Sequence, residues 1–235
     1  MKLINLPNII TCCNLLCGCL AIHSGLFGDV TAASLYIVLG AVFDFFDGMT
    51  ARMLHISGPI GKEMDSLADV VTFGVAPSVL CYRILESYSP AWNWIALLAF
   101  IMAAFSALRL AKFNCDERQS LSFIGLPTPA NALLWIGLAH LNMYDGIHSA
   151  LSIWLYLGTM LVCSCLLICE LPMFSLKVKP GHMGFGDNVV RYLFVATAVV
   201  IIVVTASLGF QPLMSSPAAI ILLYILFSLC PNKNK

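Results

Sequence analysis

Four aspartates at regular spacing lie in a chain that is otherwise strongly apolar: Asp44, Asp47, Asp65 and Asp69. The first two are three residues apart and the last two are four apart, so each pair shares one face of a helix. A carboxylate at membrane depth costs roughly 2.5–3.5 kcal/mol, so four of them need partners, and hard divalent cations suit clustered oxygen ligands. The spacing therefore predicts a site for Mg²⁺, Mn²⁺ or Ca²⁺ and not for zinc, which prefers His and Cys.

The residues around these aspartates indicate a phosphate ligand. Gly48 and Ala51 are small enough for a flat or bulky group to lie against the helix, and Arg52 offers a forked cation suited to phosphate. Gly58 and Gly61 lie where the chain must reverse between the two pairs. Metals, small residues and an arginine together predict a nucleotide-phosphate site and phosphoryl transfer. Two alternatives stay open: membrane carboxylates also line cation or proton pathways in transporters, and Arg52 could anchor a helix end at the interface.

The composition indicates which elements position these side chains. Hydrophobic residues make up 60% of the chain, charged residues 10%, and the mean hydropathy is +0.92, as in integral membrane proteins. The formal net charge of zero argues against a nucleic-acid-binding protein. We expect an all-α polytopic transmembrane bundle in a single membrane-embedded domain over 1–235. Its apolar runs, about eight in number, fall near 9–27, 31–54, 64–85, 92–113, 129–144, 149–171, 189–209 and 214–230.

The distribution of basic residues predicts the orientation of this bundle. With the N-terminus inside, all of the 12 Lys and Arg residues except Arg83 fall on the cytoplasmic side. Both termini and the aspartate stretch are then cytoplasmic, at the inner face of the cell membrane. Residues 3–13 are expected to begin with a short interfacial segment before the first span. The ten cysteines contain no C-x-x-C pair and lie largely in apolar runs, so we interpret them as small apolar residues.

Residues 44–69 read D-x-x-D-G-x-x-A-R-x8-G-x-x-x-D-x-x-x-D, which resembles the motif of the CDP-alcohol phosphotransferases at every defined position. The resemblance implies that six helices surround a polar cavity open to the cytoplasm, and that the protein is a homodimer. It also implies two metal ions, Mg²⁺ or Mn²⁺, on the four aspartates. The residues expected to hold the CDP part of the donor are Gly48, Ala51, Arg52, Gly61, Thr11 and Asn14. The resemblance covers about 5–170, leaving two additional C-terminal helices over 189–230.

Further segments resemble the phosphatidylserine synthase branch of that family. Residues 106–114, Ser-Ala-Leu-Arg-Leu-Ala-Lys-Phe-Asn, are similar to its Arg-x-Ala-Arg-Phe-Asn segment, with Lys112 where arginine is more usual. Residues 123–130 are similar to its Gly-Leu-Pro-x-Pro-Ala segment, and the opening Pro-Asn-x-x-Thr-x-x-Asn of residues 7–14 is similar too. In phosphatidylglycerophosphate synthases the position of Asn14 tends to be arginine, which favours serine as the acceptor.

The resemblance implies transfer of a phosphatidyl group from CDP-diacylglycerol to L-serine, with Asp69 taking the proton from the serine hydroxyl. The acceptor or a lipid phosphate is expected near Arg109, Lys112, Asn114, Gly125 and Pro127, although the basic residues among these could be ordinary cytoplasmic anchors. The alternatives are another acceptor within the family, such as glycerol 3-phosphate or an inositol phosphate, and a cation or proton transporter. An acceptor phosphate would require more cations than Arg109, Lys112 and Arg118 supply.

Overall fold

The computed structural model describes residues 5–56, 58–88, 93–115, 125–145, 150–171, 173 and 185–229. Within these residues the ordered elements are all helices, and there is no strand. In chain order they are α1 (Leu6–Leu26), α2 (Val30–Met53), α3 (Pro59–Asp69), η1 (Val70–Val75), α4 (Ala76–Tyr88), α5 (Asn93–Ala96), η3 (Leu97–Phe100), α6 (Ile101–Cys115), α7 (Thr128–Asp145), α8 (Ala150–Ile168), α9 (Phe185–Leu208) and α10 (Phe210–Leu229).

The described helices confirm the predicted polytopic bundle. α3, η1 and α4 follow one another without a break, and so do α5, η3 and α6, so each of the eight apolar runs corresponds to one helical segment. Within the described residues six segments are long and apolar enough to cross a membrane, and Tyr192–Leu208 is a shorter apolar helix. α7 is helical but is not among those six.

The interfacial segment expected within residues 3–13 is not a separate element in the part of the chain described. α1 begins at Leu6 and continues unbroken to Leu26. The side chain of Asn5 accepts a hydrogen bond from the Asn8 N–H and caps the helix. Pro7 lies in the first turn, where its missing N–H leaves no helical bond unmade, so it starts the helix and does not break it. Residues 1–4 lie outside the described part.

The first two helices pack closely on the helix that carries the second aspartate pair. A methyl group added at Gly18 would lie 2.5 Å from Thr72 Oγ1, and one added at Gly40 would lie 2.6 Å from Thr72 Cγ2. Small residues let helices approach in lipid, where packing replaces the hydrophobic effect as the source of association. α1, α2 and η1 therefore meet around Thr72, one turn beyond Asp69.

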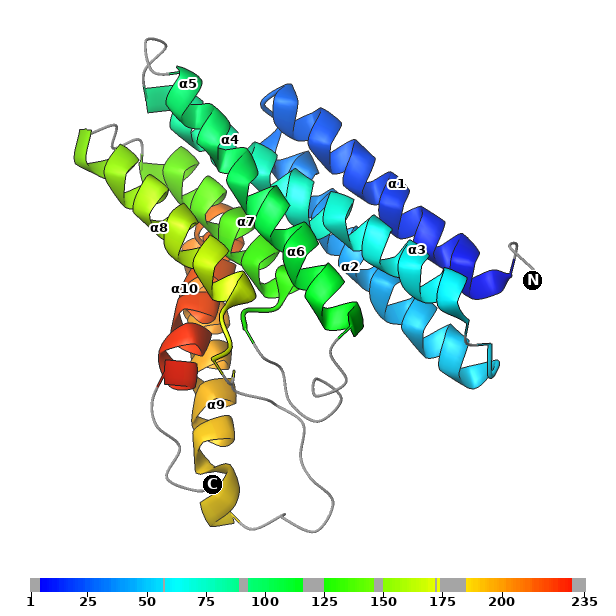
Figure 1. The fold of residues 1–235 in the computed structure, drawn as a ribbon. Helices are drawn as coiled ribbons and strands as arrows, with labels where there is room; N and C mark the ends of the chain where they lie inside the picture. The colour runs from blue at the N-terminus through cyan, green and yellow to red at the C-terminus, as the bar shows by residue number, and fades with distance from the viewer. Residues whose placement is uncertain are drawn as a thin grey trace.

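A second close contact joins the C-terminal helices to the bundle. A methyl group at Gly137 of α7 would lie 2.7 Å from the Ala218 Cβ of α10. The fully buried His140 ring lies 3.2 Å from both Ser34 Oγ of α2 and Gln211 Oε1 of α10. α10 is thus fixed to α7, and α9 packs beside it on the side of the bundle away from α1 (Figure 1).

The start of α1, the turn between α2 and α3, and the end of α6 lie at the same end of the bundle (Figure 1). Arg52, Lys62, Arg109 and Lys112 belong to these elements, whereas Arg83 lies towards the other end of the long helix and pairs with Glu86. The remaining basic residues on which the orientation was predicted lie outside the residues whose side chains are described: Lys2, Arg118, Lys177, Lys179, Arg191, Lys233 and Lys235.

Candidate metal and nucleotide site

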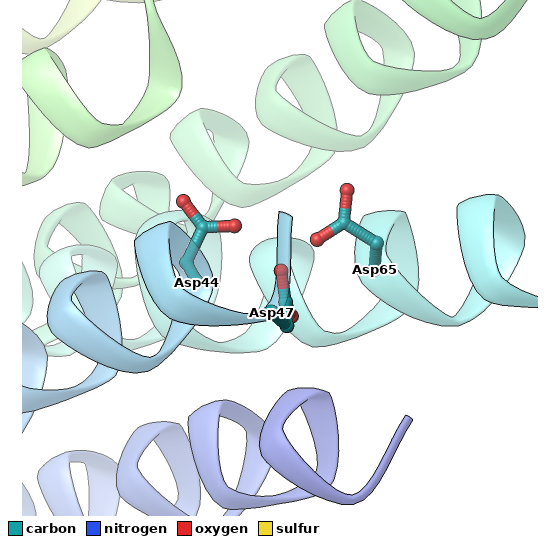
Figure 2. Close-up of side chains that lie close together, drawn as sticks. All are labelled: Asp44, Asp47 and Asp65. Carbon is teal, nitrogen blue, oxygen red and sulfur yellow. The ribbon is translucent and has the colours of Figure 1, made fainter. Parts of the chain in front are cut away.

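Three of the four predicted aspartates converge between α2 and α3. Carboxylate oxygens of Asp44, Asp47 and Asp65 all lie within 4.8 Å of one another. Figure 2 shows the first two side chains leaving α2 and the third leaving α3, with the carboxyl groups of Asp44 and Asp65 turned towards each other. The helical spacing and the chain reversal thus bring together three of the four carboxylates that were predicted to converge.

This arrangement fits a hard divalent cation. The ligand atoms are carboxylate oxygens, which Mg²⁺, Mn²⁺ and Ca²⁺ prefer. The buried Oδ1 of Asp65 has no hydrogen-bond partner among the described residues, and an unpartnered buried acceptor is costly. A bound cation would satisfy this oxygen and offset the mutual repulsion of the three carboxylates.

Asp69 lies outside that group of three and has a partner of its own. Its carboxylate is buried, and Asn14 Nδ2 donates to its Oδ1 at 3.2 Å. Thr72 Oγ1 in turn donates to the Asn14 main-chain oxygen at 3.0 Å. Asn14 thus lies between Asp69 and the tight α1–η1 contact, and its side chain orients the fourth carboxylate.

A π-helical turn follows Asp69 directly. η1 spans Val70–Val75 between two α-helical halves of the same long helix. Such turns are rare and occur frequently at functional sites, because the extra residue changes which face the following side chains occupy. Here the turn lies between the acidic half of the helix, α3, and the deeply buried half, α4.

A cavity of about 260 Å³ opens beside the carboxylates. Asp47 and Asp65 line it, and so do four residues predicted to hold the donor nucleotide, namely Thr11, Gly48, Ala51 and Gly61. Thr11 Oγ1 donates to Asp47 Oδ2 at 2.7 Å and thereby ties α1 to the aspartate group. The other residues lining the cavity are Pro7, Asn8, Ile56, Gly58 and Lys62.

Two predicted nucleotide residues lie outside the lining of this cavity. Arg52 is exposed, and its Nη1 lies 3.6 Å from the position that a Gly48 Cβ would take, so its guanidinium is near the cavity without forming a wall. Asn14 is buried and is directed at Asp69. Asn8 and Lys62 line the cavity but were not predicted to do so, although Asn8 belongs to the opening Pro-Asn-x-x-Thr-x-x-Asn segment.

The residues expected to bind the acceptor do not form one cluster. Lys112 Nζ forms an ion pair with Glu170 Oε1 at 3.0 Å, across 58 residues of chain. Asn114 donates to Ser66 Oγ at 2.8 Å, and its main-chain oxygen accepts from Lys62 Nζ at 2.7 Å. These contacts join the end of α6 to α3 and to the chain after α8.

Gly125 and Pro127 lie where the chain meets the end of α8. Gly125 has φ +75°, and its N–H donates to the Leu171 oxygen at 3.0 Å, while the Leu126 N–H donates to the Leu166 oxygen at 2.8 Å. A side chain at Gly125 would collide with carbonyl oxygens at 2.8 and 2.9 Å, so this position requires glycine. These contacts give the segment a role in packing, and its part in acceptor binding stays a prediction.

Arg109 is the one residue of the expected acceptor set that is directed into the protein. Its side chain is buried, and Nη1 donates to Thr128 Oγ1 at 3.2 Å. Thr128 begins α7, so the contact joins the end of α6 to the start of α7. Thr128 was not among the residues predicted for this site.

Comparison with known proteins gives consistent results. Residues 4–164 match the model of the CDP-alcohol phosphatidyltransferase family. A CDP-diacylglycerol–serine O-phosphatidyltransferase of Bacillus subtilis (strain 168) is 44% identical over 124 residues, which are 53% of this chain and 69% of the relative. A protein of the same name from Mycobacterium leprae (strain TN) is 33% identical over 204 residues, covering 84% of this chain and 67% of the relative. Another protein of that name, from Methanocaldococcus jannaschii, is 34% identical over 209 residues, covering 82% of this chain and 96% of the relative.

Proposed function

Because the chain belongs to the CDP-alcohol phosphatidyltransferase family, we propose that it transfers the phosphatidyl group of CDP-diacylglycerol to the hydroxyl of L-serine, releasing CMP. The observation that carries the proposal is the cavity between α1, α2 and α3, which joins two carboxylates to the small residues of the family motif. Relatives from bacteria and an archaeon that bear the name CDP-diacylglycerol–serine O-phosphatidyltransferase support serine as the acceptor.

On the donor side, Gly48, Ala51 and Gly61 leave room for the nucleotide, and Thr11 holds Asp47 in place. The exposed guanidinium of Arg52 is available for a phosphate oxygen. Asp44, Asp47 and Asp65, with Asp69 completing the set, would hold two divalent cations, Mg²⁺ or Mn²⁺. When bound, these ions neutralise the charge of the pyrophosphate and of the departing CMP.

On the acceptor side, Asp69 takes the proton from the serine hydroxyl while Asn14 fixes the orientation of its carboxylate. The serine oxygen forms a bond to the phosphorus on the lipid side, the bond from that phosphorus to the bridging oxygen breaks, and CMP leaves with the electron pair. A carboxylate is a weak base for an alcohol, so positioning of the two substrates accounts for much of the rate.

The same proposal includes the setting of the enzyme. The active site faces the cytoplasm, both termini are cytoplasmic, and the protein is a homodimer in the cell membrane. The core of about 5–170 carries the reaction, and 189–230 adds two helices within the same domain.

An acceptor panel tests the proposal. Purified protein with CDP-diacylglycerol and Mg²⁺ or Mn²⁺ is expected to release CMP with L-serine, and not with sn-glycerol 3-phosphate or inositol 1-phosphate. CMP released with one of the latter, and none with serine, would assign a different acceptor. A transporter would move cations across vesicles without both substrates, whereas family membership favours the enzyme.

A further inference from the structure

The hydroxyl of Thr72, in the π-helical turn, bonds to a different helix from its own. Buried hydroxyls in helices usually donate to a carbonyl one turn back, and those of Ser34 and Ser78 each donate to the carbonyl four residues back. Thr72 is also fully buried, but its Oγ1 donates at 3.0 Å to the main-chain oxygen of Asn14 in α1. This hydrogen bond therefore joins α1 to η1 across 58 residues of chain.

The same asparagine contacts the proposed base. Asn14 Nδ2 donates to Asp69 Oδ1 at 3.2 Å, so Asn14 meets Asp69 through its side chain and Thr72 through its main chain. Asn14 Oδ1 is buried and has no hydrogen-bond partner among the described residues. Because no described bond holds that side of the amide, its placement against the carboxylate depends on where α1 lies. The Thr72 hydroxyl fixes α1 at this point.

The two branches of the Thr72 side chain face different helices. A methyl group added at Gly18 of α1 would lie 2.5 Å from Oγ1, and one added at Gly40 of α2 would lie 2.6 Å from Cγ2. The β-branched side chain has few rotamers available, and close packing on both sides leaves it little freedom. The hydroxyl thus serves the contact with α1 and the methyl the contact with α2, so substitutions can remove either contribution separately.

We infer that Thr72 is a positioning residue for the transfer reaction: its hydroxyl fixes α1 so that Asn14 holds Asp69 in place to take the acceptor proton. The inference rests on the proposed function and adds a residue that acts through Asn14 and not on the substrate itself. A displaced carboxylate lowers the rate of proton transfer but leaves substrate binding in place, so the effect belongs in kcat and not in KM.

The test compares Thr72→Val with Thr72→Ser in the full-length protein. Valine keeps the methyl contact and removes the hydroxyl, so kcat with L-serine is expected to fall about tenfold, with KM for L-serine and for CDP-diacylglycerol within about twofold. Serine keeps the hydroxyl and removes the methyl, so it is expected to retain most of the parental kcat while lowering the melting temperature in detergent. Ser78→Ala removes a buried hydroxyl that bonds within its own helix, and it should leave kcat within about twofold.

A second pair of variants approaches the same contact from α1. Gly18→Ala directs its methyl at the Thr72 hydroxyl and is expected to lower kcat as Thr72→Val does. Gly25→Ala is its matched control, because a methyl there would lie 3.0 Å from Val79 Cγ1, in the same pair of helices but away from Asn14. This control should retain the parental kcat.

Three outcomes would overturn the inference. The first is a kcat within twofold of the parental value in Thr72→Val. The second is a kcat that follows the melting temperature across the Val and Ser variants, as expected if Thr72 only supports the fold. The third is a raised KM with unchanged kcat in Thr72→Val. Failure of the proposed function would appear differently, as a parental protein that releases no CMP with L-serine before any variant is compared.

Discussion

Asp69 differs from the other three aspartates in its surroundings. Asp44, Asp47 and Asp65 bring oxygens within 4.8 Å of one another, whereas Asp69 accepts a hydrogen bond from Asn14. The four aspartates are equivalent in the sequence motif, because residue spacing indicates which helix face a side chain occupies but not which groups surround it. We propose that Asp44, Asp47 and Asp65 hold the metal ions and that Asp69, which completes the set, also accepts the proton.

We expect Asp69→Asn to retain donor binding and to lose turnover. The amide keeps the shape of the side chain but cannot accept the serine proton, so kcat is expected to fall by about 10²- to 10⁴-fold. CDP binding by equilibrium dialysis and CMP release at saturating serine measure the two properties separately. Asp29→Asn is the control, because Asp29 caps the N-terminus of α2, at the end of that helix away from Asp44 and Asp47. Turnover near the parental rate in Asp69→Asn would show that another group is the base.

Chelation is expected to abolish CMP release, and added Mg²⁺ or Mn²⁺ to restore it. Replacing Asp65 by Asn removes a ligand whose buried oxygen has no other partner in the described structure, so the metal concentration for half-maximal rate is expected to rise at least tenfold. Glu63→Gln, an exposed neighbour on α3, should leave that concentration unchanged. Full activity in chelated samples would contradict a metal site.

At the scale of the helices, hydropathy located the elements but not their polar ends. The third apolar run was predicted to begin at residue 64, whereas α3 begins at Pro59, because Lys62 and Glu63 lower the hydropathy of its first turns. The π turn at Val70–Val75 leaves no recognisable pattern in an apolar stretch. Contacts between distant residues, such as Lys112 with Glu170, depend on the packing of helices and could not be inferred from spacing. Thr128, which accepts a hydrogen bond from Arg109, did leave a signal, because it is a polar residue at the start of an apolar run.

The contact between α2 and η1 leads to a paired stability prediction. An alanine methyl at Gly40 would lie 2.6 Å from Thr72 Cγ2 and 3.0 Å from Asn14 Oδ1, so Gly40→Ala is expected to destabilise by about 1–3 kcal/mol. It should also lower activity, because Asn14 holds Asp69. Gly158→Ala meets nothing within 4 Å and is expected to be neutral or slightly stabilising. Thermal unfolding in detergent measures both, and equal melting temperatures would show that the α2–η1 contact is looser than described.

At the scale of the whole molecule, the helical segments follow the apolar runs closely, and four of the five described basic residues, all except Arg83, lie at the end that carries the site. The orientation predicted from them can be tested by fusing reporters after Lys235. A fluorescent protein that folds only in the cytoplasm should be bright, and alkaline phosphatase, which requires export, should be inactive. The reverse pattern would place the C-terminus, and with it the aspartate site, on the outer side.

α10 packs on α7, and this contact matters for function as well as for stability. α10 lies outside the residues that match the family, yet it packs on α7, whose first residue, Thr128, accepts a hydrogen bond from the buried Arg109. If the acceptor binds near Arg109, as the sequence predicts, the nucleotide half and the alcohol half of the enzyme are bounded by different parts of the chain. Chimeras that exchange residues 185–229 between relatives would then be a way to tune the choice of alcohol while leaving the CDP-binding half unaltered.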